Sequence, residues 1–444
     1  MIAKLLNVIL LVILVSIPVF AQYPADPQLL SEINKIKAID NHAHPLRYVA
    51  EGGKPDDEYD ALPLESIDPF PLPLRLSPEN REFIDAWKHF YGYNYNDMLQ
   101  AHTDELLTVK KKVLQQQGQN FPSWVLDQLN IETMFANRVA MGTGLVAPRF
   151  RWVSFVDALL FPLDNETAKK SNRDYAGFYP GEEKLLKRYL GDLGLNSLPA
   201  TLNEYETKVV TATLERQKAQ GVIALKYEAA YLRLLDFDKP DPTIARATYD
   251  RFSRGGVPPP QDYKALQDYL FYYIAKEAGR LGLAIHIHMI DGAGSYYRPS
   301  GSNPLLLESV FNDPELRKTN FVLVHGGFPF TRQTISMFGK PNVYADFSAQ
   351  TFFIYPRALS EVLRSWLESY PDRVLFGTDA FSFGPLIDWP EVAWLSNWTA
   401  RQALALALTG MMNDGEISRE RAMELARMVL RENAIKLYKL SEGH

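Results

Sequence analysis

Eight short apolar runs, separated by helical stretches, constrain the fold of this chain more than any other feature. Each run is rich in β-branched or aromatic residues and ends in polar or glycine residues, which is typical of a buried strand. Apolar strands that alternate with helices indicate a parallel sheet covered by helices. The expected strands are residues 36–41, 131–138, 151–157, 222–228, 283–290, 321–326, 343–348 and 374–379. Examples of the intervening helices are 262–281 and 357–369.

Eight such strands predict an α/β protein with a closed (β/α)8 TIM barrel, and an open doubly wound sheet is the alternative. Two long insertions follow the first and third strands, over residues 45–130 and 158–221. Because barrel active sites are built from the segments that follow strands, we expect both insertions to form walls or a lid. Residues 417–440 are predicted to form a terminal amphipathic helix on the outside of the barrel.

The first residues have the pattern of an export signal. Lys4 precedes an apolar run over 5–20, and Val19-Phe20-Ala21 supplies small residues at the −3 and −1 positions of a cleavage site. We therefore expect a signal peptide at 1–21 and a mature barrel domain at 22–444, in the periplasm or secreted. An uncleaved anchor is the alternative, and no later segment is apolar enough to span a membrane.

Composition narrows the chemistry and the partners. The chain has no cysteine, which excludes disulfides, thiolate metal sites and cysteine nucleophiles, so any metal is held by nitrogen and oxygen ligands. The net charge of −6 argues against nucleic-acid binding. The expected partner is a small-molecule substrate, with no membrane association after signal cleavage; the oligomeric state, including a homo-oligomer, stays open.

Five of the eight histidines lie at expected strand ends, and a lysine and an aspartate accompany them. A spacing of two in an extended segment puts both imidazoles of a pair on one side. Because a barrel brings the carboxyl ends of all its strands to one rim, these side chains are expected to converge into a metal site. The set is His42 and His44, Lys226, His286 and His288, His325, and Asp379.

Together these motifs resemble the metal-dependent amidohydrolase superfamily, specifically its amidohydrolase-2 branch. The resemblance extends from about residue 36 to residue 440, and it is weakest in the insertion at 45–130. The motifs that carry it are His42-Ala-His44, Lys226, His288, Asn303-Pro304-Leu305, His325-Gly-Gly, Gly377-Thr378-Asp379 and Asn433-Ala434.

The resemblance implies roles for these residues. His42 and His44 would bind the more buried metal together with Asp379. His288, on which the family motif aligns better than on His286, would complete a single-metal site or bind a second ion. His325 would be a second-metal ligand or a catalytic histidine.

Lys226 matches the position that is carboxylated and bridges two ions in two-metal members. Single-metal members manage without that bridge, so the number of ions, one or two, stays open.

The chemistry of these residue types fits a hydrolase. A bound Zn²⁺ lowers the pKa of water to about 7. Asp379 would accept the proton of that water and pass it to the leaving group, and His325 would help to polarise the carbonyl. Zn²⁺ is the expected metal, and Mn²⁺ or Fe²⁺ would also suit histidine and aspartate ligands.

The expected reaction is hydrolysis of an amide, cyclic amide, lactone or ester bond in a small substrate that bears a carboxylate. Arg138, Arg151 and Arg298 lie beside strand ends and are candidates for holding that carboxylate. A metal-dependent non-oxidative decarboxylase or hydratase is the alternative, and a non-catalytic binding barrel is the remote one.

Overall fold

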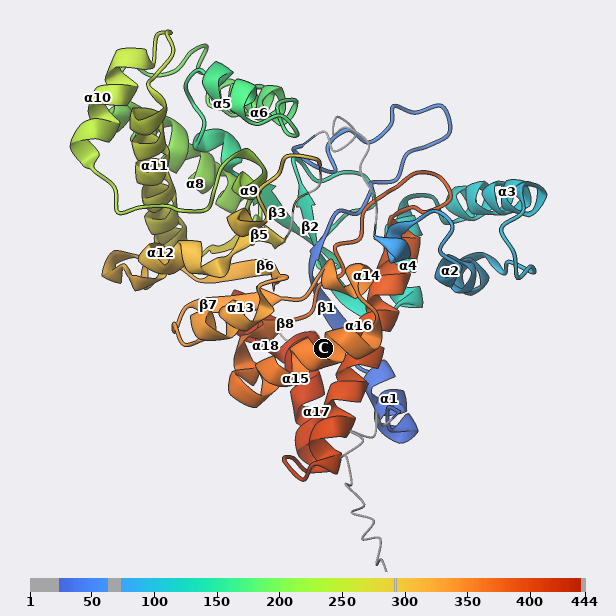
Figure 1. Ribbon diagram of the computed structural model, residues 1–444. Coiled ribbons are helices and arrows are strands. Elements are labelled where there is room, and N and C mark those ends of the chain that lie inside the picture. The colour runs from blue at the N-terminus through green and yellow to red at the C-terminus, as the bar shows by residue number, and fades with distance from the viewer. Residues whose placement is uncertain (1–23, 63–72, 291, 293, 441–444) are drawn as a thin grey trace, which may run out of the picture.

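The computed structural model describes residues 24–62, 73–290, 292 and 294–440, and they form a parallel barrel (Figure 1). The predicted signal peptide at 1–21 lies outside the described residues. Eight strands form one sheet, and each pairs in parallel with the next strand along the chain. They are β1 (Ala38–Ala43), β2 (Ile131–Arg138), β3 (Phe150–Phe155), β4 (Ala224–Tyr227), β5 (Ala284–Ile290), β6 (Phe321–Phe328), β7 (Val343–Asp346) and β8 (Val374–Leu375).

Backbone hydrogen bonds between β1 and the segment after β8 bring the two ends of the sheet together. The Asn41 N–H donates to the Phe376 carbonyl over 2.8 Å, and the Asp379 N–H donates to the His42 carbonyl over 2.7 Å. A Cβ on Gly377 would lie 2.9 Å from the Ser348 Cβ, so glycine allows this close approach. The predicted (β/α)8 barrel is confirmed, and the open doubly wound sheet is wrong.

Helices cover the outside of the barrel, and the predicted helices at 262–281 and 357–369 are confirmed as α11 and α15. Among the described residues, no helix has the length and the hydropathy needed to cross a bilayer. The α-helices before residue 414 are α1 (Pro27–Asn34), α2 (Glu82–Tyr91), α3 (Gln100–Gln117), α4 (Phe121–Gln128), α5 (Glu166–Ser171), α6 (Phe178–Asp192), α7 (Leu202–Tyr205), α8 (Ala212–Ala219), α9 (Ala229–Leu232), α10 (Pro242–Phe252), α11 (Pro260–Leu281), α12 (Glu308–Asn312), α13 (Thr331–Phe338), α14 (Gln350–Phe353), α15 (Pro356–Ser369) and α16 (Trp389–Asn413).

Short helical turns complete the connections. They are the 3₁₀ turns η2 (Leu74–Leu76), η3 (Gly118–Asn120), η4 (Asp157–Leu159), η6 (Pro299–Ser302), η7 (Pro304–Leu307), η8 (Pro314–Leu316) and η9 (Pro371–Arg373), and the π-helix η5 (Glu206–Thr211). The connection from β1 to β2 contains η2, α2, α3, η3 and α4, and that from β3 to β4 contains η4, α5 to α7, η5 and α8. In Figure 1, α2 and α3 stand on one side of the barrel, and α5 and α6 on the other.

The terminal segment differs from its prediction. It consists of α17 (Arg419–Arg427), the π-helix η10 (Met428–Glu432) and α18 (Asn433–Tyr438). Ala434 and Leu437 of α18 pack in one cluster with interior residues of the barrel, so α18 closes the barrel at the amino ends of its strands. The apolar face of this segment thus meets the open end of the barrel as well as its outer helices. The interior residues of that cluster are Ile39, Phe135, Val153, Ala224, Ala284, Val322, Val324 and Leu375.

Candidate metal centre

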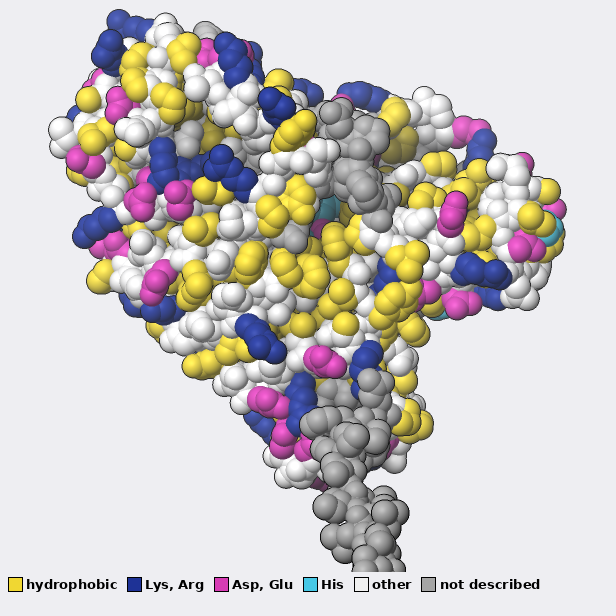
Figure 2. Space-filling model, in the orientation of Figure 1, with side chains coloured by type: hydrophobic (Ala, Val, Ile, Leu, Met, Phe, Trp, Pro, Cys, Tyr) yellow, Lys and Arg dark blue, Asp and Glu magenta, His cyan; other side chains and the backbone are white. Residues whose placement is uncertain are grey.

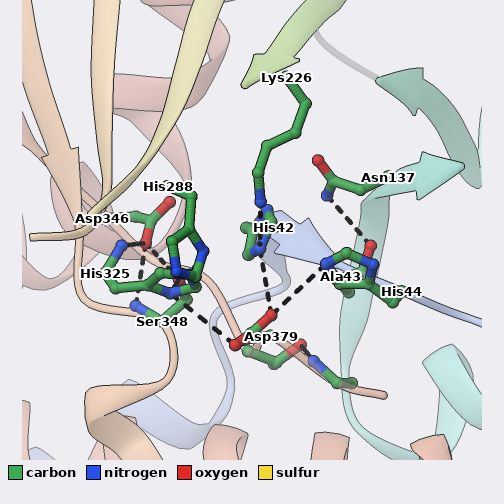
Figure 3. A network of polar contacts seen from close by, with 12 residues as sticks. His42, Ala43, His44, Asn137, Lys226, His288, His325, Asp346, Ser348 and Asp379 are labelled. Carbon is green, nitrogen blue, oxygen red and sulfur yellow. Dashed lines mark hydrogen bonds and ion pairs between the residues drawn. The ribbon is translucent and has the colours of Figure 1, made fainter. Parts of the chain in front are cut away.

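His42 of β1 and His44, which directly follows this strand, converge on Asp379, which follows β8 (Figure 3). The His42 Nε2 lies 3.1 Å from the Asp379 Oδ1, and the His44 Nε2 lies 3.7 Å from the same oxygen. The two histidines are buried. The spacing of two between these histidines therefore has the predicted effect: both imidazoles reach one carboxylate.

His325 of β6 and His288 of β5 complete the group. The His325 Nε2 lies 3.1 Å from the His288 Nδ1, and the His325 Nδ1 lies 3.8 Å from the Asp379 Oδ2. His42, His325 and Asp379 offer ligand atoms that all lie within 4.8 Å of one another. Figure 2 shows a histidine and an acidic side chain at the bottom of a hollow in this face of the molecule.

Lys226 of β4 lies inside the same site rather than at a surface. Its side chain is fully buried, and its Nζ is 3.3 Å from the His42 Nε2 and 3.5 Å from the Glu228 Oε1. The ammonium therefore has one carboxylate and one imidazole as immediate neighbours.

The backbone is strained at two of these residues. His325 has a φ of 66° and Asp379 a φ of 54°, a region that costs a non-glycine residue about 1–3 kcal/mol. Each is held by neighbours: the Gln350 Nε2 donates to the His325 carbonyl over 2.9 Å, and the Asp379 N–H donates to β1. This conformation aims both side chains at the rim of the barrel.

Burial sets the protonation of the site. It lowers the pKa of His42 and His288 well below the ordinary value, and nearby Lys226 adds to the effect. Burial, followed by the adjacent His288, does the same to the pKa of His325. The imidazoles are therefore neutral and offer lone pairs, the form in which histidine binds a metal. Burial also raises the pKa of Asp379 to about 7.

These residues fit a divalent cation. Neutral imidazoles and a carboxylate form a nitrogen and oxygen donor set of the kind that binds Zn²⁺, Mn²⁺ or Fe²⁺. The His288 Nε2 is buried and lacks a hydrogen-bond partner in the part of the chain that the structure describes. A buried polar atom without a partner is costly in an apoprotein and is expected in a site that receives a ligand.

Asp60 and Glu228 also belong to the site, and sequence reasoning missed both. The Asp60 Oδ2 lies 3.1 Å from the His44 Nδ1, and His44, Asp60 and Glu228 form a second group of ligand-type atoms within 4.8 Å. Asp60 comes from the long segment after β1, where no local pattern marks it. Glu228 follows Lys226 with a spacing of two, a signal that could have found it.

The three arginines proposed as carboxylate ligands lie in different places. Arg138 is buried and makes two 2.8 Å bonds to Asp56, so its guanidinium holds the segment after β1. Arg151 lines a hollow with Lys37 and Ile39 near the amino end of β1, away from the metal ligands. The structure brings neither Arg138 nor Arg151 to the candidate metal centre.

Arg298, in contrast, lines a cavity of about 480 Å³ that also contains His288 and Tyr231. The Tyr231 ring packs against the His288 ring with a centroid distance of 4.4 Å. Arg173, Arg233 and Lys264 line the same cavity. Because His288 belongs to both, this cavity lies beside the candidate metal centre.

The model of the amidohydrolase family matches residues 195–440, more than half of the chain. The chain belongs to the amidohydrolase family. The matched region contains Lys226, His288, His325 and Asp379, and the resemblance stated from the sequence is confirmed. This amidohydrolase is an enzyme of the metal-dependent hydrolase type, and the remote alternative of a non-catalytic binding barrel is wrong.

Individual proteins share a part of the sequence or the fold of this chain. The chain is 33% identical over 143 residues to protein fluG of Emericella nidulans; the match covers 32% of this chain but only 16% of that relative. Glucuronate isomerase of Caulobacter crescentus superimposes with a TM-score of 0.62 at 14% identity, over 96% of this amidohydrolase and 97% of that chain. Uronate isomerase of Thermotoga maritima gives a TM-score of 0.60 at 12% identity, over 93% and 98%. At such identities the two structures show the common fold alone.

Proposed function

We propose that this amidohydrolase uses water to cleave an amide, cyclic amide, lactone or ester bond of a small substrate that bears a carboxylate. The convergence of His42, His44 and Asp379 beside a cavity that contains Arg298 carries the proposal. The histidines and the aspartate supply the metal site, and the cavity supplies the place for the anion.

Each residue then has a defined task. His42, His44, Asp379 and His288 would hold the metal, for which we propose Zn²⁺, and His325 would supply a further ligand nitrogen. When bound, such an ion lowers the pKa of water and polarises a carbonyl. The Asp379 carboxylate accepts a proton from the attacking water and delivers it to the leaving group, as a general base and then a general acid.

The charge of the cavity favours an anionic substrate. Arg233 and Lys264 are already paired with Asp268 over 2.7 and 2.8 Å. Arg173 and Arg298 are exposed at the cavity and make no ion pair with any residue that the structure describes. A guanidinium binds a carboxylate through two parallel hydrogen bonds, so these two arginines are the proposed anion ligands.

The first test of the proposed function is the metal content of protein purified without chelator, measured by elemental mass spectrometry. About one ion per chain is expected for a site made by His42, His44, His288 and Asp379, and about two for a pair bridged by carboxylated Lys226. No metal, even after incubation with Zn²⁺, Mn²⁺ or Fe²⁺, would contradict the proposal.

The second test is the product formed from a panel of carboxylate-bearing amides, lactones and esters in ¹⁸O-labelled water. Incorporation of one labelled oxygen supports hydrolysis, whereas release of CO₂ without added water would indicate the decarboxylase. Arg298→Gln is expected to raise KM about tenfold or more, because one charge-assisted hydrogen bond is worth about 1.5–3 kcal/mol. Arg254→Gln, at an exposed residue outside the cavity, is the matched control and should leave KM unchanged.

We also propose that the protein is exported and that its signal peptide is cleaved after Ala21. Lys4 and the apolar run that follows it support this proposal. Amino-terminal sequencing of the protein from its host tests this. A mature chain that begins at Gln22 supports export, and one that begins at Met1 contradicts it.

A further inference from the structure

A buried serine determines which nitrogen of His325 carries the proton. The Ser348 Oγ lies 2.9 Å from the His325 Nδ1 and makes a short hydrogen bond to the Asp346 Oδ1. The same Asp346 oxygen accepts the backbone N–H of His325 over 2.9 Å and that of Ser348 over 3.0 Å. Because the carboxylate only accepts, the single hydroxyl hydrogen of Ser348 goes to Asp346.

The consequence for His325 follows from counting hydrogens. The Ser348 oxygen has given its only hydrogen away, so it accepts from the Nδ1–H of His325. The Nε2 of His325 is then unprotonated, and its lone pair points toward the His288 Nδ1 at 3.1 Å. Nε2 therefore carries the free lone pair of His325, whereas Nδ1, the nitrogen that lies 3.8 Å from the Asp379 Oδ2, carries the proton.

The other oxygen of Asp346 is reached from the terminal helix. Its Oδ2 accepts the Asn41 Nδ2–H over 2.9 Å, and the Asn41 Oδ1 accepts the Tyr438 hydroxyl over 2.5 Å. The Tyr438 oxygen, having given its hydrogen to Asn41, accepts the Nε2–H of His286 over 2.6 Å. Each hydrogen has one assignment, and the network runs from α18 through the barrel interior to the metal centre; Figure 3 shows the part formed by Asp346, Ser348 and His325.

We infer that Ser348 and Asp346 are positioning residues that fix His325 as its Nδ1-protonated tautomer. Tyr438, through Asn41, holds the Asp346 carboxylate in place, so the terminal helix takes part in orienting a metal ligand. The inference rests on the metal dependence of the proposed reaction and is independent of its substrate.

Burial explains why these contacts matter. Asn41, Asp346 and Ser348 are fully buried, and His325 is 1% exposed. Water cannot replace a hydrogen bond that is removed there, so the loss falls on the geometry of the remaining partners. Partners of this kind, one step away from the metal, typically change metal affinity or activity by about 10–100-fold when mutated.

Ser348→Ala tests the first half of the network. Two quantities are measured on the full chain: the Zn²⁺ dissociation constant, by competition with a chromophoric chelator, and the histidine tautomers, by ¹⁵N NMR before and after Zn²⁺ is added. We expect about 10–100-fold weaker Zn²⁺ binding and loss of the fixed Nδ1–H tautomer of His325 in the metal-free protein. Ser348→Thr, which keeps the hydroxyl, should restore both.

The matched control is Ser360→Ala, which removes another buried serine hydroxyl. That hydroxyl donates to the Arg357 carbonyl within α15, and neither residue is one of the candidate metal ligands. It should leave Zn²⁺ affinity and the His325 tautomer unchanged.

Tyr438→Phe tests the second half and keeps the inference falsifiable if Ser348→Ala does not fold. It removes one hydroxyl and keeps the ring, which packs on Phe135 with a centroid distance of 4.7 Å. We expect this variant, like Ser348→Ala, to bind Zn²⁺ more weakly than the parent protein. Tyr249→Phe removes a hydroxyl that donates to the Pro199 carbonyl instead, and it should have no effect on Zn²⁺ binding.

An unchanged His325 tautomer and an unchanged Zn²⁺ dissociation constant in folded Ser348→Ala and Tyr438→Phe proteins would overturn the inference. If instead both readouts move and no substrate of the panel is turned over, the proposed substrate class fails and the positioning role stands.

Discussion

At the scale of single residues, burial makes the site a metal-binding one. His42 and His288 are kept neutral because burial and nearby Lys226 lower the pKa of each imidazole. The same burial raises the pKa of Asp379 to about 7, which is where a general base and acid for neutral conditions needs to titrate. One physical cause therefore acts on the candidate ligands and on the proposed proton-transfer group together.

His42→Ala and His44→Ala are expected to release the metal, and Asp379→Asn to keep part of it while turnover falls by about 10²–10⁴-fold. The reason is that each histidine supplies a ligand nitrogen, whereas the asparagine retains an oxygen ligand but cannot accept a proton. Metal content and kcat are measured together, with the exposed His89→Ala as control. Full metal occupancy in the His42→Ala/His44→Ala double variant would show that the assignment is wrong.

Glu182 of α6 gives a prediction about pH. It is buried, neither carboxyl oxygen has a hydrogen-bond partner among the described residues, and burial, followed by Asp157, raises its pKa well above the ordinary value. The folded protein keeps a proton there at pH values at which the unfolded chain has lost it. The free energy of unfolding therefore falls as the pH rises above the unfolded pKa of Glu182 and toward its folded pKa.

Glu182→Gln removes this dependence, because the amide stays neutral at every pH. At pH 8 we expect the free energy of unfolding of the variant to exceed that of the parent protein by about 1.4 kcal/mol for each pKa unit of the shift. Near pH 4 the two proteins should be equally stable. Thermal unfolding across that pH range measures it. Glu183→Gln, on the adjacent and more exposed residue, should show no such gain; equal Tm differences at both pH values for Glu182→Gln would contradict the prediction.

At the scale of elements, a buried ion pair holds the long segment between β1 and β2 on the barrel. Arg138 at the end of β2 makes its paired bonds to Asp56, and both side chains are nearly inaccessible. Asp60, four residues further along, contacts His44. The anchor therefore places an insertion residue beside a metal ligand, a role that the position of Arg138 at a strand end does not reveal.

Arg138→Met is expected to destabilise the protein by about 3–5 kcal/mol, because the buried Asp56 carboxylate loses the guanidinium that makes two bonds to it and keeps only the longer ion pair with Arg47, at 3.5 Å. Urea unfolding measures the loss. The double variant Arg138→Met/Asp56→Asn should recover part of it, since no buried charge then remains. A double variant no more stable than Arg138→Met would mean that the ion pair is not the cause.

At the scale of the whole molecule, the terminal helix finishes the barrel. Leu437 and Ala434 join the interior cluster at the amino ends of the strands, while Tyr438 reaches Asn41. The last described helix thus contributes to the core and to the metal centre at once.

Leu437→Ala is expected to lower the free energy of unfolding by about 2–5 kcal/mol, because it opens a cavity in a packed interior. Met423→Ala, at a partly exposed position on α17, should cost less. Thermal unfolding compares the two. Equal losses would indicate that α18 does not close the barrel end.

Sequence reasoning found the strands and the paired histidines, because periodicity and spacing are local properties of the sequence. Strand runs such as 131–138 are bounded by local composition, and the spacing of His42 and His44 fixes a common side. It missed contacts that join distant segments: Asp60 has no flanking pattern, and Tyr438 looks like one more aromatic residue on an amphipathic helix. Arg298 and Arg151 look alike in sequence, and only their positions at opposite ends of the barrel separate them.

The sequence by itself determined the barrel, the family and the metal-ligating residue types, because alternating strands and helices and paired histidines are local patterns. The tertiary structure alone decided which way those ligands face. The Ser348 hydroxyl, the Asp346 carboxylate and the Tyr438 hydroxyl come from segments that only the closed barrel brings together. The proton positions in the site depend on those contacts, so they exist only in the folded chain.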